Sequence, residues 1–155
     1  FAEEHEGMLY NSQNIIDTQG VLKATYRKIH LFDADLPWAT PGDTYMTVKT
    51  PFGRIGTGIC MDLNFDDFID YHLEAGTDII CFSANWLDEG HEIEPYWKMR
   101  IYPFPGLIIA ADRSGEEYGT EFIGSSMLLL NGETLTRCGK EHNALLRYRL
   151  RISMD

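Results

Sequence analysis

The chain has 155 residues, with 13 basic and 24 acidic side chains and a formal net charge of −11. This length fits a single domain over residues 1–155, because domains commonly contain about 100–200 residues. The acidic balance argues against nucleic acid and anionic membranes as partners, since both bind clustered Lys and Arg. No apolar run approaches the ~18 residues of a membrane-spanning helix, and the acidic start of the chain lacks the apolar core of a secretory signal.

The chain contains three cysteines, Cys60, Cys81 and Cys138. They are too few and too scattered for a disulfide framework, and an odd number without a secretory signal fits a reducing compartment. We therefore expect a cytoplasmic protein in which one thiol is available for chemistry. No CxxC or HxxxH spacing marks a metal site, so we expect neither a metal nor another cofactor.

Polarity patterns and turn residues divide the first half of the chain into short strands. In chain order, the predicted elements are a hairpin with strands at 8–16 and 21–31 around a turn at 17–20, a loop over 32–43, and strands at 45–50 and 54–60 around a turn at 51–53. The last of these strands is almost entirely apolar or small, which is typical of a strand buried on both faces.

The second half of the chain predicts alternating helices and strands. In chain order, we expect a helix capped by Asn64 and ended by Gly76, a strand at 78–83, a helix at 92–101, a strand at 107–111, a hairpin with strands at 123–130 and 134–138 around a type I′ turn at Asn131-Gly132, and a closing strand at 146–152. Strand, helix and strand with tight links predict a parallel pair. The fold class is therefore α/β, with both parallel and antiparallel strands.

Cys60 ends a predicted buried strand a few residues before a predicted helix. Side chains at such junctions emerge at the carboxyl edge of the sheet, where α/β proteins place their sites. Free cysteines are also common as small buried hydrophobic residues, so position alone leaves both interpretations open. Cys81 and Cys138 are more typical of packing residues.

Lys28 is the second notable side chain. On the predicted strand it shares one face with Tyr26 and His30. A lone lysine in a strand is usually a solvated edge residue, and that interpretation would suffice if Lys28 stood alone.

Ordered motifs connect these two residues. The segments YRKIHLF at 26–32, PFGRIG at 51–56 and GICMD at 58–62 resemble the nitrilase or carbon–nitrogen hydrolase superfamily. The likeness continues downstream, in the expected order, at 84–86, 112–117 and 122–126. Each motif is weak by itself, but the ordered set is specific and covers nearly the whole chain.

The resemblance implies an α-β-β-α sandwich that hydrolyses amides, nitriles or carbamoyl groups through a Glu–Lys–Cys triad. It implies that Cys60 is the nucleophile and Lys28 the triad lysine. The Lys28 ammonium and the Met61 backbone N–H would then hold the oxyanion, and Asp62 would brace the turn. No glutamate matches the triad position, and Glu3, Glu4 and Glu6 carry no matching motif, so the N-terminal part of the family fold is expected to be absent from this chain.

Other positions take expected roles from the same resemblance. Asn85 and Trp86 would border the cleft as substrate-binding residues, although a loop amide and a core indole are equally ordinary there. Arg113 and Glu117 are expected to form an ion-paired scaffold or a subunit contact within a homo-oligomer. Asp33 or Asp35, in the loop after Lys28, could help to position a substrate.

Three functional interpretations remain open. Details at 59–64, 86–87, 96–97 and 113–116 favour the protein N-terminal asparagine or glutamine amidase branch, whose partner is a peptide N-terminus. The first alternative is a small-molecule amidase or nitrilase that acts on an amide-bearing small molecule. The second is a non-catalytic remnant or interaction module that keeps the hydrolase fold without the triad glutamate.

Overall fold

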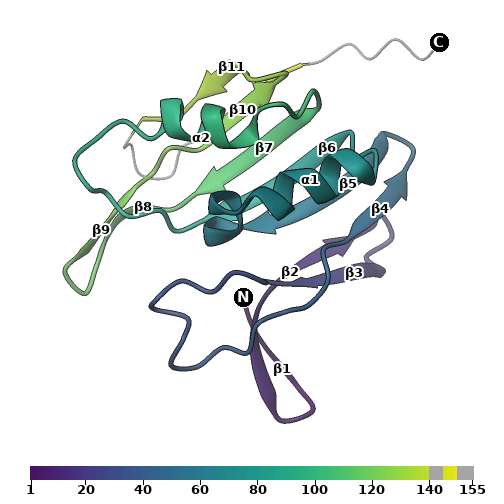
Figure 1. The fold of residues 1–155 in the computed structure, drawn as a ribbon, viewed down its shortest axis with the longest axis vertical. Helices are drawn as coiled ribbons and strands as arrows, with labels where there is room; N and C mark the ends of the chain where they lie inside the picture. The colour runs from purple at the N-terminus through teal and green to yellow at the C-terminus, as the bar shows by residue number, and fades with distance from the viewer. Residues whose placement is uncertain (140–144, 150–155) are drawn as a thin grey trace.

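The computed structural model describes residues 1–139 and 145–149 (Figure 1). The strands are β1 (Ala2–His5), β2 (Met8–Ile16), β3 (Leu22–Arg27), β4 (Thr47–Thr50), β5 (Gly53–Ile59), β6 (Ile79–Ala84), β7 (Leu107–Asp112), β8 (Ser114–Glu117), β9 (Thr120–Ile123), β10 (Met127–Leu130) and β11 (Glu133–Arg137). The helices are the 3₁₀-helix η1 (Cys60–Asn64), α1 (Asp66–Glu74) and α2 (Glu94–Ile101). None of the helices in these ranges is long and apolar enough to cross a membrane.

The main sheet has six strands in the order β11-β10-β7-β6-β5-β4. The central neighbours β5, β6 and β7 run parallel, and the outer pairs are antiparallel. The register pairs Ile59 with Ser83 and Ala84 with Asp112, so three parallel strands end side by side. The predicted parallel arrangement is confirmed, and it brings the residues that follow these strands to one edge of the sheet.

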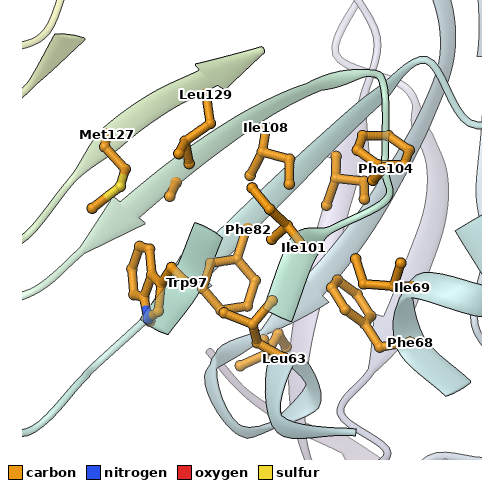
Figure 2. Close-up of a cluster of buried hydrophobic side chains, with 14 of the residues drawn as sticks. Leu63, Phe68, Ile69, Phe82, Trp97, Ile101, Phe104, Ile108, Met127 and Leu129 are labelled. Atoms are coloured by element: carbon orange, nitrogen blue, oxygen red, sulfur yellow. The ribbon is translucent and has the colours of Figure 1, made fainter. Parts of the chain in front are cut away.

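Helices α1 and α2 cover one face of this sheet (Figure 1). The buried side chains of this layer come from the helices, the facing strands and the α2–β7 connection; those labelled in Figure 2 are Leu63, Phe68, Ile69, Phe82, Trp97, Ile101, Phe104, Ile108, Met127 and Leu129. The Phe82 ring meets Trp97 edge-on, with ring centroids 5.4 Å apart, and lies 6.3 Å from Phe68. Burying side chains of this size contributes about 1.5–3 kcal/mol each, so this layer fixes the sheet beneath the helices.

The strands β1, β2 and β3 form a second, antiparallel sheet. It meets the opposite face of the main sheet, because Gln13 of β2 accepts a 3.2 Å hydrogen bond from Ser83 Oγ and donates one of 3.2 Å to the Cys81 carbonyl. Ser83 and Cys81 alternate along β6 with Phe82, which faces the helices. The described residues therefore form a helical layer, a mixed sheet and a second sheet.

Several predicted boundaries were wrong. Asn64 does not cap α1: the chain first forms η1, and the Asn64 side chain instead contacts Met61 Sδ and accepts a hydrogen bond from Tyr96. The strand predicted at 123–130 is broken after β9, because Gly124 turns the chain at a φ of +67°. The return strand of the first hairpin ends at Arg27, one residue before Lys28.

The predicted closing strand at 146–152 is also corrected. Residues 145–149 lie in none of the described strands, and Leu145 and Tyr148 are exposed. Alternating polarity forms a strand only where an edge and an apolar surface are there to receive it. The remainder of that prediction, 150–152, lies outside the described residues. The type I′ turn is confirmed, since Asn131 and Gly132 have φ values of +51° and +76°.

Candidate active site

Cys60 lies where β5 ends and η1 begins, at the carboxyl edge of the main sheet. Its φ is +46°, in the left-handed region that residues other than glycine seldom adopt. Such conformations persist only where the surrounding structure holds them, and they concentrate at functional sites. Asn85 follows β6 and Asp112 ends β7, so the ends of three neighbouring strands lie around the thiol.

Asp62 holds the turn that carries Cys60. Its fully buried carboxylate accepts hydrogen bonds from the Ile59 N–H at 2.8 Å, the Tyr26 hydroxyl at 2.7 Å and the His30 N–H at 3.0 Å. Burial raises the pKa of Asp62, while these hydrogen bonds oppose the rise. The two carboxylate oxygens thus accept three hydrogen bonds, which is the arrangement expected of a residue that stabilises the turn.

Lys28 is buried, with 2% of its surface exposed, so it is not a solvated edge residue. Its Nζ lies 2.5 Å from Oδ2 of Asp35, which is buried in the loop after the lysine. Burial raises the pKa of Asp35, but hydrogen bonds from Lys28 and the Phe32 N–H, with the lysine's charge, bring it below its usual value. The site therefore holds a lysine–aspartate ion pair.

Lys28 and Cys60 line the same cavity of about 500 Å³. Asp35 and Asn85 also line it, and Glu117 of the β8–β9 hairpin contributes to its wall. Because Lys28 follows the second sheet and Cys60 follows the main sheet, the cavity lies where the two sheets meet. The fold thus brings together two residues that are 32 positions apart in the sequence.

A second cavity of about 320 Å³ also reaches Cys60. Its wall includes Met61, Trp86, Tyr96 and Glu89, and it shares Asn85 with the first cavity. The predicted substrate-binding pair Asn85 and Trp86 therefore lies beside the thiol. No lysine or arginine of the described chain lines this second cavity.

Burial raises the pKa of the Cys60 thiol. The positive charge of Lys28 and a hydrogen bond from the Asn85 backbone N–H lower it, while the negative charges of Asp112 and Asp35 raise it. The strongest group that favours the thiolate is therefore Lys28. This balance matters because the thiolate is the nucleophilic form of cysteine.

Asp112 is a site residue that received no role from the sequence. It accepts hydrogen bonds from the Trp86 N–H and the Ser125 N–H, both at 3.0 Å. Burial raises its pKa to about 6 despite those hydrogen bonds. The carboxylate thereby fixes the turn that carries Asn85 and Trp86.

Glu3, Glu4 and Glu6 do not line the cavity that contains Lys28. Glu3 accepts hydrogen bonds from Arg27 and Ser12, and chiefly the Arg27 hydrogen bond lowers its pKa to about 2. Glu4 and Glu6 are exposed. Among the described residues that line the Lys28 cavity, the carboxylates are those of Asp35 and Glu117.

Arg113, which directly precedes β8, forms an ion pair of 2.8 Å with Glu117 at the end of that strand, and the Arg113 guanidinium lies 4.5 Å from the centre of the Phe122 ring. They form a scaffold within the chain, and their contact with another subunit stays a prediction. In the described ranges, no three His, Cys, Asp or Glu side chains are grouped so that they could hold a metal ion.

A mixed sheet carries a cavity at the carboxyl edge of its parallel strands, and this cavity contains both a thiol and an ammonium group. The chain is therefore an α/β protein whose site has the groups that nucleophilic catalysis by cysteine requires. The family model described as carbon-nitrogen hydrolase matches residues 1–148. The chain belongs to the carbon–nitrogen hydrolase family.

The sequence is also similar to those of known amidases and nitrilases. The chain is 37% identical to the human omega-amidase NIT2 over 89 residues, which cover 52% of this chain and 32% of that protein. It is 27% identical to a probable nitrilase of Schizosaccharomyces pombe over 148 residues, 94% of this chain and 54% of that protein. The chain thus spans about half, or less, of the length of these relatives.

The fold is similar to that of the amidase from Nesterenkonia sp. AN1, in a mutant with the acetamide moiety of fluoroacetamide added covalently at the active-site cysteine. The TM-score is 0.78 at 17% identity, covering 86% of this chain and 52% of that one. The fold class expected from the sequence, an α/β sandwich of carbon–nitrogen hydrolase type, is confirmed. The relatives are omega-amidases and nitrilases, and they do not single out the N-terminal amidase branch.

Proposed function

We propose that the protein carrying this chain hydrolyses a small carboxamide to a carboxylate and ammonia, with Cys60 as the nucleophile. The observation that carries the proposal is the Cys60 thiol in a left-handed turn, facing one cavity with the buried Lys28 ammonium. A nearby cation favours the thiolate, which free cysteine forms only to a few per cent at neutral pH.

The proposed reaction has two halves. The Cys60 sulfur attacks the amide carbon, a C–S bond forms, and the oxyanion is held by the Lys28 ammonium and by the Met61 backbone N–H. The C–N bond then breaks, and the nitrogen leaves as ammonia with the proton that the Cys60 thiol gave up. Water attacks the thioester and the C–S bond breaks, so that the hydroxyl of the water forms a carboxylic acid and its other proton returns to the Cys60 sulfur. The acid ionises to the carboxylate at neutral pH. Donors aimed at such an oxyanion are typically worth ~10²–10³ in rate each.

Amides are favoured over nitriles as substrates because the relatives include several omega-amidases and one of the similar solved structures is an amidase. The aromatic wall formed by Trp86 and Tyr96 suits a compact substrate with an apolar portion. This proposal takes up the small-molecule alternative of the sequence analysis.

The test measures ammonia release by the protein expressed from its complete native coding sequence, with small aliphatic amides, peptides with N-terminal asparagine or glutamine, and nitriles. We expect small amides to be turned over, Cys60→Ala to abolish turnover without unfolding the protein, and the matched control Cys81→Ala to retain it. Turnover of nitriles alone would exclude the amidase proposal. Release of ammonia by Cys60→Ala would exclude the nucleophile, and inactivity toward every substrate would favour the interaction module.

The N-terminal amidase stays as a second candidate because of Glu89. This carboxylate lies on the wall of the second cavity, 3.9 Å from His91 on the same wall. No described lysine or arginine lines that cavity, so it favours a cationic amine over a carboxylate on the substrate. Glu89→Gln would then weaken turnover of peptides with N-terminal asparagine more than turnover of neutral amides. Glu133→Gln, a change of an exposed acid on β11, is the matched control. Equal effects of Glu89→Gln on both substrates would exclude this role.

Cytoplasmic location and homo-oligomeric assembly stay predictions. Light scattering on the purified complete protein tests the second.

A further inference from the structure

We propose that Asp35 is a positioning residue that holds the Lys28 ammonium against the Cys60 thiol. The inference rests on the proposed function only in that this function makes Cys60 the nucleophile. The contact itself is a property of the fold.

The first argument is the geometry of the ion pair. Asp35 Oδ2 lies 2.5 Å from Lys28 Nζ, and both residues line the cavity that contains Cys60. The side chain of Lys28 is 3% exposed and that of Asp35 is 11% exposed. A buried ammonium without a counter-charge costs far more than an exposed one, so this carboxylate supplies what burial of Lys28 requires.

The second argument is that Asp35 is itself fixed. Its Oδ2 accepts a hydrogen bond of 3.0 Å from the Phe32 N–H, and its Oδ1 accepts one of 3.1 Å from the Asn11 side chain. The carbonyl of Asn11 also accepts the Lys28 N–H at 2.8 Å. Asn11 of β2 therefore holds both members of the pair, the lysine through its backbone and the aspartate through its side chain.

The third argument concerns the lysine side chain. Four flexible carbons separate the ammonium from the backbone, and a lysine has no planar fork that fixes its direction. A backbone hydrogen bond at Lys28 cannot orient Nζ. The Asp35 carboxylate can orient Nζ, because it is itself held from two directions. The other N–H groups of the ammonium then face the cavity.

The pKa of the Cys60 thiol distinguishes a positioning role of Asp35 from a simple effect of its charge. The negative charge of Asp35 raises the pKa of Cys60, and the positive charge of Lys28 lowers it more strongly. If Asp35 acts only through its own charge, Asp35→Asn should lower the pKa of the thiol. If Asp35 holds the ammonium in place, the same change also removes the larger, opposing effect, and the pKa of the thiol should rise.

The experiment measures alkylation of Cys60 by iodoacetamide between pH 6 and pH 10 in the complete protein, followed by mass spectrometry of the Cys60 peptide. We expect the midpoint of the pH profile to rise by about half a unit to one unit in Asp35→Asn. The asparagine keeps an acceptor oxygen for the Phe32 N–H. Asp33→Asn is the matched control, since Asp33 is an exposed acid of the same loop, and its profile should be that of the unaltered protein.

A midpoint that falls or stays unchanged in Asp35→Asn overturns the proposal. If Asp35→Asn does not fold, Asn11→Ala tests the same contact from β2 and should raise the midpoint by a smaller amount, and an unchanged midpoint again overturns it. The readout needs no substrate. A raised midpoint in a protein that hydrolyses no amide would therefore support the role of Asp35 and reject the proposed function.

Discussion

The Tyr26 hydroxyl donates a hydrogen bond of 2.7 Å to Asp62 Oδ2, and both residues are fully buried. Tyr26 precedes Lys28 by two positions, and Asp62 follows Cys60 by two positions. This hydrogen bond therefore joins the strand that leads to the ammonium with the turn that holds the thiol.

Removing the Tyr26 hydroxyl should destabilise the protein. Tyr26→Phe leaves a buried carboxylate short of one donor, and such losses typically cost about 1–3 kcal/mol. Urea unfolding measures the change. Tyr10→Phe is the matched control in the same sheet, because within residues 1–139 and 145–149 the Tyr10 hydroxyl donates its hydrogen bond to Met8 Sδ, at 3.5 Å. Equal losses in the two variants would contradict the role of the Tyr26–Asp62 hydrogen bond.

Gly58 should not tolerate a side chain. A Cβ at Gly58 would overlap the ring of Phe68, which packs α1 on β5. We expect Gly58→Ala to lower the free energy of unfolding by about 1–3 kcal/mol through overpacking. The double variant with Phe68→Leu should recover part of the loss relative to the two single variants, because the smaller side chain makes room. Strictly additive losses would show that the overlap does not matter.

His72 should make the protein sensitive to mild acid. It is fully buried, and burial lowers its pKa from 6.5 to about 4, against a hydrogen bond with the Thr57 carbonyl. Because the unfolded chain binds the proton more tightly, the stability from neutral His72 is present above about pH 6.5 and is lost as the pH falls toward 4. The shift corresponds to roughly 3 kcal/mol.

Urea unfolding at pH 7, 6, 5 and 4 tests this expectation. His72→Gln should flatten the dependence of stability on pH across that window. His91→Gln should leave the dependence unchanged, since the His91 side chain is 61% exposed. A slope that is the same in His72→Gln as in the unaltered protein would refute the assignment.

Lys28 should set the reactivity of Cys60. Lys28→Met removes the positive charge that most strongly lowers the pKa of the thiol, so the midpoint of the alkylation profile should move to higher pH. Lys23→Met is the control, because the side chain of Lys23, which lies in β3 shortly before Lys28, is 45% exposed and pairs with Asp17. A shift of equal size in both variants would mean that overall charge, and not the Lys28 ammonium, controls the thiol.

Much of the main sheet is predictable from the sequence, because β5, β6 and β7 are short apolar runs bounded by turn residues. β1 is not predictable in this way. Ala2–His5 is acidic and mostly exposed, and its pairing depends on the backbone of β2 and on Glu3 with Arg27. Residues 145–149 show the opposite case, in which a strand-like pattern finds no partner among the described strands.

The candidate site also contains residues that the sequence predicts and residues that it does not. Cys60 and Lys28 follow from ordered motifs, and the strand order explains why Cys60 lies at the sheet edge. The contact of Lys28 with Asp35 depends on how a loop with two prolines folds back, which no periodicity describes. Glu117 enters the cavity wall from the β8–β9 hairpin, which the polarity pattern does not predict.

Lys28 and Cys60 approach each other from two different sheets, and the alignment of the layers therefore sets the distance between them. A slide of one sheet over the other by a single residue, about 3.3 Å, would separate the ammonium from the thiol while every ladder within each sheet stayed paired. We therefore expect mild heat or denaturant to lower the reactivity of Cys60 before circular dichroism records a loss of strands, which alkylation and circular dichroism on the same samples would check. The reactivity of Cys60 would therefore report a displacement of one sheet relative to the other, which the content of secondary structure would not reveal.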